Sequence, residues 1–377
     1  MANEQTAEVV KLHSYSSAVT RYPSPIEEDI NMASGVNAAV VGYGYAGRSF
    51  HSYLIGLAEG LNLYAISTRD AGRRVAAERE RNVKTYPNID ELLKDDNVDL
   101  VVIATPHDTH AELAIKSMDA SKHVVVDKAM CMNTAEADAM IEASKRNKVM
   151  LSIFQNRRWD GGYLTVKKVI EDGLLGDVFL IQVAILGYGR PRTWRGIKAQ
   201  VGGQIYDWGA HLVDQALRLV PSKVDTVFCD TQHRKWDIDI ESHLNCITRF
   251  ENGVSYGIEL SNICRFSKPR WFVVGELGTL VKTGLDPQEA AMNRGEIEAA
   301  REDPENRARV KTEVNGVATE MTLDTIPGNW KAYYQNISDV LNKGAELAVK
   351  PEEVRENMRL IDAIMESAEK GVSVKMD

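Results

Sequence analysis

Three residues of this chain, Lys128, Asp207 and His211, are of the types that a proton and hydride transfer at an alcohol carbon requires. A histidine titrates near neutral pH and can accept the proton of a hydroxyl group. A lysine ammonium can polarise the oxygen on which negative charge develops, and a carboxylate can orient the hydroxyl and the imidazole. The three side chains would therefore serve the oxidation of a secondary alcohol, provided that the fold brings them together.

The spacing of these residues does not by itself assign them this role. Asp207 and His211 are four residues apart in a segment predicted to be helical (204–220), so they share one face of the helix. Asp214 continues the same stripe, and the polar face of an ordinary amphipathic helix explains the pattern equally well. Lys128 follows an apolar strand by two residues, and a surface lysine in a strand-to-helix loop is the simpler interpretation of that position.

A glycine-rich motif near the start of the folded chain predicts where a nucleotide would bind. The apolar run 36–41 predicts a buried strand, the sequence Gly42-Tyr43-Gly44-Tyr45-Ala46-Gly47 follows it, and a helical pattern and a second strand (61–66) come next. Gly42 allows a tight turn, Gly44 lets the backbone approach a pyrophosphate, and Gly47 lets the helix pack closely on the strand. The strand and helix on either side separate this motif from glycines in ordinary turns. We therefore expect a dinucleotide at the helix N-terminus, whose nicotinamide would carry the hydride.

Strands and helices continue to alternate through the first half of the chain. Helical patterns with Gly60 as a C-cap and with Asp108 and Thr134 as N-caps separate further apolar strands, which lie at 98–104, 124–126 and 149–154. This order predicts right-handed crossovers and a parallel sheet. The fold class expected is α/β, with a Rossmann domain of doubly wound parallel strands at 36–154.

The second half predicts a different architecture, a C-terminal α+β domain at 155–377. Strand-like runs recur there without long helices between them, at 178–186, 224–231, 244–250, 254–261 and 271–275. They predict a mostly antiparallel open sheet with one face toward the substrate and the other free for a second subunit, and hence a homodimer or homotetramer. Helices after Trp330 would return to cover the nucleotide domain. The polar residues 1–35 fit a disordered tail and an arm around a partner subunit equally well.

The end of the second predicted strand bears on the choice of cofactor. An acidic residue there would bind the adenosine 2′-hydroxyl of NAD, but the chain has Ser67-Thr68-Arg69, and Asp70 comes two residues late. Arg69, with Arg73 one turn later, could instead pair with the 2′-phosphate of NADP. Solvated surface arginines are the alternative. The pattern favours NADP over NAD.

These features together resemble the Gfo/Idh/MocA oxidoreductase family over residues 36–375. The resemblance is carried by several segments in the same order as in the family: G-Y-G-Y-A-G-R-S-F-H (42–51), A-T-P-H-D-T-H (104–110), V-V-V-D-K-A (124–129) and G-G-Q-I-Y-D-W-G-A-H (202–211). Two more, F-Q-N-R-R-W-D (154–160) and G-L-D-P-Q-E-A (284–290), resemble a subgroup that includes NADP-dependent scyllo-inositol dehydrogenases.

The resemblance implies an NAD(P)-dependent dehydrogenase acting on a sugar, glycoside or cyclitol, with Lys128, Asp207 and His211 as catalytic residues and His211 as the general acid and base. Besides the glycine motif, Thr68 and Arg69, the implied cofactor contacts are Thr105, Pro106, His107, His110, Asp127, Lys128, Trp194 and Arg195. The segment with Trp194 and Arg195 resembles a loop that closes over the nicotinamide. Substrate contacts are expected from Arg158, Trp194, Asp207 and His211, and Tyr333 is a weaker candidate.

Two positions depart from the family pattern. The family usually has Glu-Lys-Pro with a cis peptide bond before the proline, whereas this chain has Asp127-Lys128-Ala129. Because a cis bond before alanine costs about 3 kcal/mol relative to trans, we expect a trans bond here. His107 replaces an asparagine that is common in its loop.

The composition excludes several other classes of function. A net charge of −9 argues against a surface for nucleic acid or an anionic membrane, and no apolar stretch is long enough to span a bilayer. Four cysteines without a C-x-x-C pair suit reduced thiols, and hence a cytoplasmic protein. His107 and His110 form an H-x-x-H pattern without a nearby third ligand, so no metal is expected.

Two other functions compete with a dehydrogenase that exchanges its cofactor. One is a redox-neutral enzyme that retains NAD(H) and acts on glycosides by oxidation, elimination and reduction. The other is a non-catalytic sensor that binds a dinucleotide and a sugar. A sensor would not need Lys128, Asp207 and His211 together, and retention of the dinucleotide on purification would favour the redox-neutral enzyme.

Overall fold

The computed structural model describes residues 35–376. The predicted tail or arm therefore lies outside the described residues, except for Gly35. Within 35–376, no helix is both long and apolar enough to cross a membrane.

The N-terminal domain contains a six-stranded sheet in the order β3-β2-β1-β4-β5-β6, with every neighbouring pair parallel. Its strands are β1 (Val36–Val41), β2 (Leu61–Ser67), β3 (Lys84–Tyr86), β4 (Leu100–Ile103), β5 (His123–Val126) and β6 (Leu151–Ile153). All four residues of β4 are buried, as expected for a strand with both faces covered. The predicted Rossmann architecture is confirmed.

Helices connect these strands, and several of their ends differ from the sequence-based expectations. The helical segments are η1 (Ala46–His51), α1 (Ser52–Ile55), α2 (Ala71–Arg81), α3 (Ile89–Leu92), η2 (His107–Thr109), α4 (His110–Asp119) and α5 (Thr134–Asn147). The helix after the glycine motif ends at Ile55, so Gly60 is not its C-cap but a turn residue before β2. Asn133, not Thr134, caps α5 with its side chain. Asp108 lies within η2 and caps nothing.

The C-terminal domain is built on a nine-stranded sheet in the order β14-β13-β12-β11-β7-β10-β9-β8-β15. Its strands are β7 (Val178–Leu186), β8 (Val224–Gln232), β9 (His243–Phe250), β10 (Ser255–Ser261), β11 (Trp271–Gly275), β12 (Gly278–Lys282), β13 (Ala308–Val314), β14 (Val317–Leu323) and β15 (Val374–Lys375). Only the β7–β10 pair is parallel. The mostly antiparallel sheet is confirmed, and β12 to β15 are strands that the sequence did not predict.

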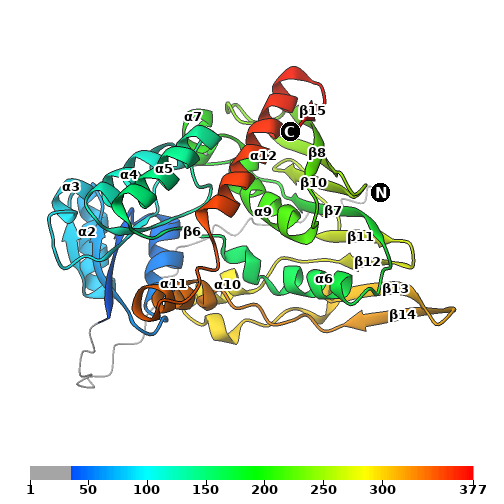
Figure 1. The fold of residues 1–377 in the computed structure, drawn as a ribbon, viewed down its shortest axis with the longest axis horizontal. Coiled ribbons are helices and arrows are strands. Elements are labelled where there is room, and N and C mark those ends of the chain that lie inside the picture. Colours follow the sequence, from blue (N-terminus) through cyan, green and yellow to red (C-terminus); the bar gives the residue numbers. More distant parts are fainter. Residues whose placement is uncertain (1–34, 377) are drawn as a thin grey trace, which may run out of the picture. The chain divides into compact units, whose positions relative to one another are not determined.

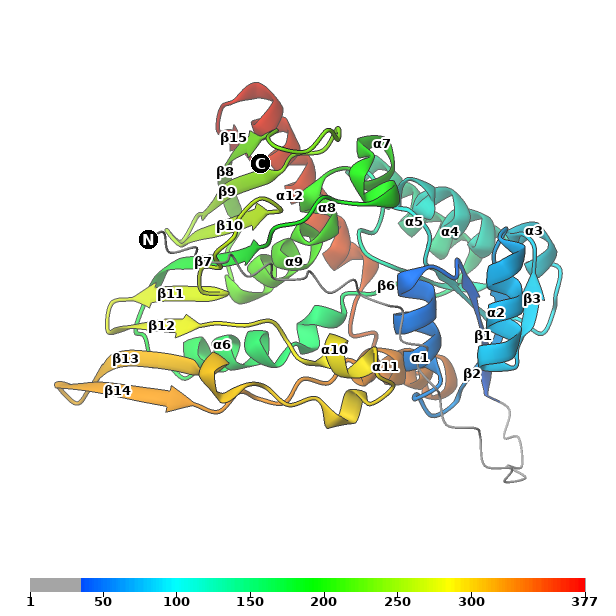
Figure 2. The ribbon, with the colours of Figure 1, turned by 180° about the vertical axis from the view of Figure 1, so that it is seen from behind.

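The helical segments of the second half are η3 (Asn156–Trp159), α6 (Gly161–Glu171), η4 (Thr193–Gly196), α7 (Lys198–Val201), α8 (Gln204–Asp207), α9 (Gly209–Leu219), α10 (Gln288–Met292), η5 (Ile297–Ala299), η6 (Pro304–Asn306), α11 (Lys331–Lys343) and α12 (Pro351–Lys370). Helices α6, α9 and α12 lie along one face of the nine-stranded sheet (Figures 1 and 2). As expected, the helices after Trp330 return to the first domain: α11 contacts α1 and β1, and α12 contacts α5 as well as β8.

Candidate active site

The three residues proposed for proton transfer line one pocket of about 270 Å³. Lys128 follows β5 at the carboxyl edge of the parallel sheet, where ligands of open α/β sheets bind. Asp207 ends α8, and His211 lies in the first turn of α9. Lys128 Nζ is 2.6 Å from Asp207 Oδ1 and also donates to the Asp207 carbonyl oxygen at 2.7 Å. The fold therefore brings the ammonium, the carboxylate and the imidazole together.

Asp207 and His211 lie on two short helices, not on the single helix that the sequence predicted. Trp208 joins α8 to α9 with helical backbone angles, so the four-residue spacing still directs both side chains into the pocket. Burial opposes ionisation of Asp207, but the charges of Lys128 and Arg195 offset it and hold its pKa well below the usual range. Asp207 is thus an ionised partner that orients the ammonium.

The environment of His211 keeps its imidazole neutral. Burial, together with the positive charges of Lys128 and Arg157, lowers the pKa of His211 well below its ordinary value. Its Nδ1 lies 3.0 Å from Oε1 of Gln155, an acceptor, so Nδ1 carries the proton and Nε2 has a free lone pair. This tautomer is the one that can accept a proton at Nε2.

The peptide bond between Lys128 and Ala129 is cis, so the expectation of a trans bond was wrong. That expectation weighed only the isolated bond, whereas tertiary contacts decide the conformation here. Ala129 is fully buried, and its carbonyl oxygen lies 2.7 Å from Nδ1 of His110. His110 Nε2 lies 2.9 Å from the carbonyl oxygen of Thr105, so this ring ties the loop after β4 to the loop after β5. With both nitrogens facing carbonyl oxygens, His110 has no lone pair directed at a metal.

The glycine motif forms a cradle beside the same pocket, which Tyr45 and Ala46 also line. A Cβ atom at Gly47 would lie 1.9 Å from the carbonyl oxygen of Gly42, so this position needs glycine for packing. At Gly44 a Cβ would meet only the Arg73 guanidinium, at 3.9 Å. Packing does not explain this glycine, but close approach of a pyrophosphate does. The residues present therefore fit a dinucleotide.

The end of β2 is rich in cationic side chains. Arg69 and Arg73 are exposed, whereas Arg74 is engaged by the carbonyl oxygens of Thr68 and Arg69. Asp70, the nearest carboxylate in sequence, caps α2 by accepting the backbone N–H of Arg73. Asp70 therefore acts as the N-cap of α2, which explains why it lies two residues after the position that would bind the adenosine 2′-hydroxyl of NAD.

Of the remaining predicted cofactor residues, only Asp127 and Arg195 line the pocket. Asp127 accepts the Lys128 backbone N–H at 2.8 Å and faces His51. His107 is buried, its Nδ1 lies 2.9 Å from the Val201 carbonyl oxygen, and burial lowers its pKa to about 3. The ring of Trp194 contacts His107 at 4.9 Å and does not line the pocket of Lys128. Arg195 does line it, and its Nε donates to Asp207 Oδ2 at 3.2 Å. Thr105 and Pro106 lie in the loop between β4 and η2.

Two family models match the chain. The NAD-binding Rossmann-fold model of the Gfo/Idh/MocA oxidoreductases matches residues 36–155, and a C-terminal domain model of the same family matches 163–281. YdgJ of Escherichia coli K12, an uncharacterized oxidoreductase, is 34% identical over 345 residues, or 89% of this chain and 97% of that protein. The chain belongs to the Gfo/Idh/MocA family. It is thus an NAD(P)-dependent oxidoreductase.

The names of other relatives state a substrate or a cofactor. The NADP+-dependent scyllo-inositol 2-dehydrogenase IolW of Bacillus subtilis 168 is 29% identical over 352 residues, or 91% of this chain and 96% of that protein. A crystal structure of an NAD-binding protein from Listeria innocua has a TM-score of 0.79 and 31% identity, covering 90% of this chain and 96% of that one. Inositol dehydrogenases are therefore among the family members that this chain is similar to.

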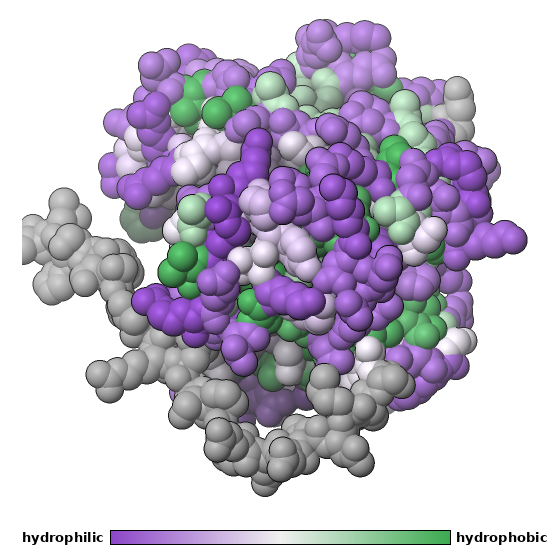
Figure 3. Space-filling model, turned by 90° about the vertical axis from the view of Figure 1, so that its left-hand side faces the viewer, coloured by the Kyte–Doolittle hydropathy of each residue, from purple (hydrophilic) through white to green (hydrophobic). Residues whose placement is uncertain are grey.

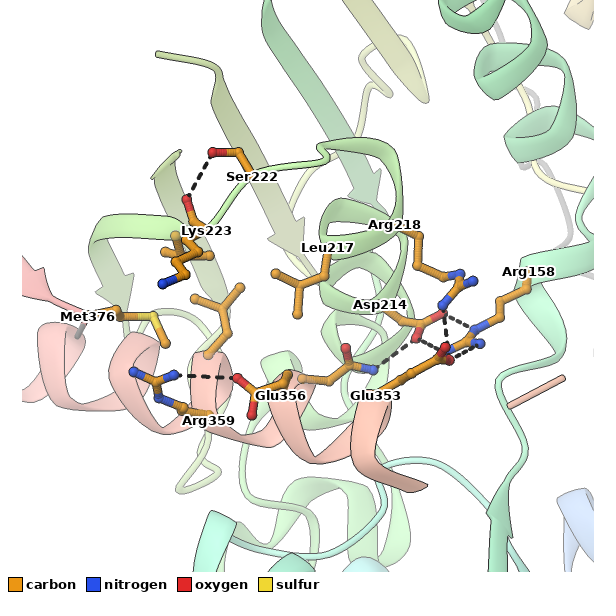
Figure 4. A pocket seen from close by; sticks show the side chains of 13 residues that line it. Arg158, Asp214, Leu217, Arg218, Ser222, Lys223, Glu353, Glu356, Arg359 and Met376 are labelled. Atoms are coloured by element: carbon orange, nitrogen blue, oxygen red, sulfur yellow. Dashed lines mark hydrogen bonds and ion pairs between the residues drawn. The ribbon is translucent and has the colours of Figure 1, made fainter. Parts of the chain in front are cut away.

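Besides Trp194, the expected substrate residue Arg158 and the weaker candidate Tyr333 lie outside the pocket of this Gfo/Idh/MocA protein. Arg158 is buried behind α9, where it donates to both carboxylate oxygens of Asp214 at 2.7 and 2.8 Å and to Glu353 at 2.8 Å. These residues line a separate cavity of about 430 Å³ (Figure 4). Tyr333 is 1% exposed and donates to Ser152. Both side chains make contacts within the protein, and neither lines the pocket of Lys128.

Several pocket residues were missed by the sequence analysis. Arg157 lines the pocket in place of Arg158, and Asn156, Trp208 and Glu289 line it as well. The motif at 154–160 did point to this loop, but adjacent residues in a tight turn face different directions, and the sequence does not say which of two arginines faces inward. Gln155, which sets the His211 tautomer, gave no signal.

Proposed function

We propose that this protein transfers a hydride between NADP(H) and a secondary alcohol or ketone carbon of a cyclitol or sugar. The observation that carries the proposal is that Lys128, Asp207, His211 and the glycine motif border one pocket. The names of the inositol dehydrogenase relatives support a polyol substrate.

The protein's own groups would manage the proton and the developing charge. His211 accepts the hydroxyl proton at Nε2, because its Nδ1 is occupied by Gln155. Lys128, held by Asp207, stabilises the alkoxide as the carbonyl forms. The nicotinamide, when bound, supplies the hydride acceptor or donor. In the reverse direction, His211 returns the proton to the same oxygen.

Two buried donors in the pocket support a substrate with several hydroxyl groups. Asn156 and Arg157 are 2% and 6% exposed, and both line the pocket. Asn156 Nδ2 and Arg157 Nε have no hydrogen-bond partner among the described residues. Because Asn156 and Arg157 bring polar side chains to the pocket wall, the hydroxyl groups of a polyol would find hydrogen-bond donors there. We assign substrate binding to Arg157 in place of Arg158.

NADP is preferred over NAD in this proposal because of Arg69 and Arg73. Both side chains are exposed, and Arg73 borders the open space at Gly44. Asp70 caps α2 through Oδ1, and its Oδ2 forms a solvent-exposed ion pair with Arg73 at 3.8 Å, a kind of pair that contributes little. A planar guanidinium pairs well with the 2′-phosphate of NADP.

A second copy of the chain would cover the open face of the C-terminal sheet, giving a homodimer or homotetramer. Phe228 and Ile247 are register partners on β8 and β9, and they are 41% and 49% exposed. Their neighbours Val227 and Cys246 are buried, so the two large side chains point away from the helices. By contrast, the side of the molecule seen in Figure 3 is mostly hydrophilic. Large apolar side chains that are exposed side by side among polar ones are a feature of subunit interfaces.

The test is turnover of defined polyols with both cofactors. The purified protein is mixed with NADP+ or NAD+ and with scyllo-inositol, myo-inositol, free sugars or glycosides, and the absorbance of the reduced nicotinamide is followed. We expect reduction of NADP+ with at least one cyclitol or sugar. Absence of turnover with every polyol, in protein shown to bind NADP+, would reject the dehydrogenase. A dinucleotide that co-purifies and does not exchange would favour the redox-neutral enzyme.

A further inference from the structure

The segment 284–290 fixes the loop that carries Arg157, although no role in the proposed chemistry has been given to it. Asp286 Oδ2 accepts the backbone N–H of Gly161 at 2.7 Å. Gln288 donates to the Trp159 carbonyl oxygen and accepts the backbone N–H of Trp330. These bonds hold the start of α10 against η3, so the position of α10 and the position of the Arg157 loop are linked.

Glu289 extends this link to the nucleotide domain. Its Oε2 accepts from Arg157 Nη2 at 2.9 Å, and its Oε1 accepts from the Tyr45 hydroxyl at 3.0 Å. Tyr45 belongs to the glycine motif, and its hydroxyl also accepts from Asn293 Nδ2 at 2.9 Å. One carboxylate therefore bridges the glycine motif and the substrate pocket, and all three bridging residues line that pocket.

Arg157 depends on these partners for its position. Its guanidinium lies over the rings of Trp208 at 4.3 Å and Trp330 at 5.2 Å, and it pairs with Asp160 at 3.3 Å in addition to Glu289. Trp208 directly follows Asp207 and contacts the His211 ring at 6.4 Å. A shift of Glu289 would therefore change the position of Arg157, whose side chain lines the pocket.

We infer that Glu289 and Tyr45 are positioning residues that couple dinucleotide binding to substrate binding. The inference rests on the proposed dinucleotide site. A dinucleotide on the glycine motif restrains the backbone at Tyr45, the Tyr45 hydroxyl then holds Glu289, and Glu289 holds Arg157 in the orientation that receives the polyol. Because coupling between two sites is reciprocal, the polyol also tightens dinucleotide binding. The protein with bound cofactor therefore has the higher affinity for the polyol.

Hydrogen–deuterium exchange tests this coupling without any turnover. In the wild-type protein, NADP+ is expected to slow exchange both in the glycine motif (42–47) and in α10 (288–292). In Tyr45→Phe, NADP+ should still protect the motif but no longer α10. Tyr53→Phe is the matched control, because it also removes a tyrosine hydroxyl that joins the two domains, at Ile297, but lies outside the pocket. In Tyr53→Phe, NADP+ should slow exchange in both segments, as it does in the wild type.

Kinetics with the best polyol from the turnover screen provide a second measurement. Tyr45→Phe and Glu289→Ala should raise KM for the polyol about tenfold and leave kcat almost unchanged, whereas Tyr53→Phe should change neither. Protection of α10 that is equal in Tyr45→Phe and wild type would overturn the coupling and leave the dinucleotide site intact. Absence of protection at the glycine motif itself would instead reject the proposed function.

Discussion

The ammonium of Lys128 lies 2.6 Å from the carboxylate of Asp207, although 79 positions separate the two residues in the chain. The contact joins a loop of the parallel sheet to the helix pair α8–α9, which carries His211. It therefore fixes the ammonium beside the imidazole, and the first prediction depends on it.

Replacing either proton-handling residue should abolish turnover without preventing cofactor binding. Lys128→Met and His211→Asn are each expected to lower kcat/KM about 10³-fold, because the first removes the charge opposite the alkoxide and the second removes the base. Lys168→Met and His233→Asn, both at exposed positions, are the controls. NADP+ affinity, measured by titration calorimetry, should stay close to that of the wild type. Turnover at the wild-type rate in Lys128→Met or His211→Asn would show that the replaced residue does not take part in the reaction.

The turnover of an alcohol should respond little to mild acidity, because the pKa of His211 is lowered well below 6.5. A base with an ordinary histidine pKa would lose activity as the pH falls from 8 to 6, whereas His211 stays neutral over that range. We expect kcat/KM for the polyol to remain nearly flat between these values. A steep loss of kcat/KM centred near pH 6.5 would show that the imidazole of His211 is more exposed to solvent than it is in the structure.

The folded state should lose stability below pH 6.5, because buried histidines resist protonation. The pKa of His107 is lowered from 6.5 to about 3 by burial, so the stabilising effect of its neutral form is complete above pH 6.5 and is lost as the pH falls. At pH 5 the loss from this residue alone is about 2 kcal/mol. The carboxylates with lowered pKa, Asp127 and Asp207, cannot explain a change there, since they stay ionised in folded and unfolded chains.

Thermal unfolding followed between pH 7.5 and 5 measures this effect. His107→Gln should lower Tm at pH 7.5 but give a shallower dependence on pH than the wild type. Parallel curves for the two proteins would assign the pH dependence to other groups.

Replacing either of the two adjacent arginines breaks a buried ion pair, but only the Arg157 variant should weaken substrate binding. Arg157→Gln removes a pocket donor and should raise KM for the polyol. Arg158→Gln breaks a buried ion pair with Asp214, whose side chain is 2% exposed, and should lower the free energy of unfolding by about 3 kcal/mol. KM of the folded Arg158 variant should stay within a few-fold of wild type. Urea unfolding and steady-state kinetics on the same samples separate these effects, and a large KM change confined to Arg158→Gln would restore it as the substrate residue.

Arg157 and Arg158 also show which features of the site the sequence could not predict. Strands with clear apolar patterns were predicted well, and β7 and β11 have the predicted bounds. β13 was missed because charged, exposed residues alternate with its buried ones, as a sheet with one solvent-exposed face allows. Glycine spacing predicted the tight turn and the close packing after β1, where a Cβ at Gly42 or Gly47 would clash with backbone atoms. The sequence could not predict which of the two arginines faces the pocket, or that the Lys128–Ala129 bond is cis, because both depend on tertiary contacts.

The choice between NADP and NAD can be tested at the end of β2. Arg69→Ala and Arg73→Ala should each raise KM for NADP+ about tenfold, since each removes a charge-assisted hydrogen bond to the 2′-phosphate. KM for NAD+, which has no such phosphate, should change little. Arg79→Ala is the control, because Arg79 is an exposed arginine of the same helix α2, farther from Gly44 along the chain. Equal effects of the Arg69 and Arg73 variants on both cofactors would mean that these arginines act on the fold or on the shared pyrophosphate, and the preference for NADP would have to be abandoned.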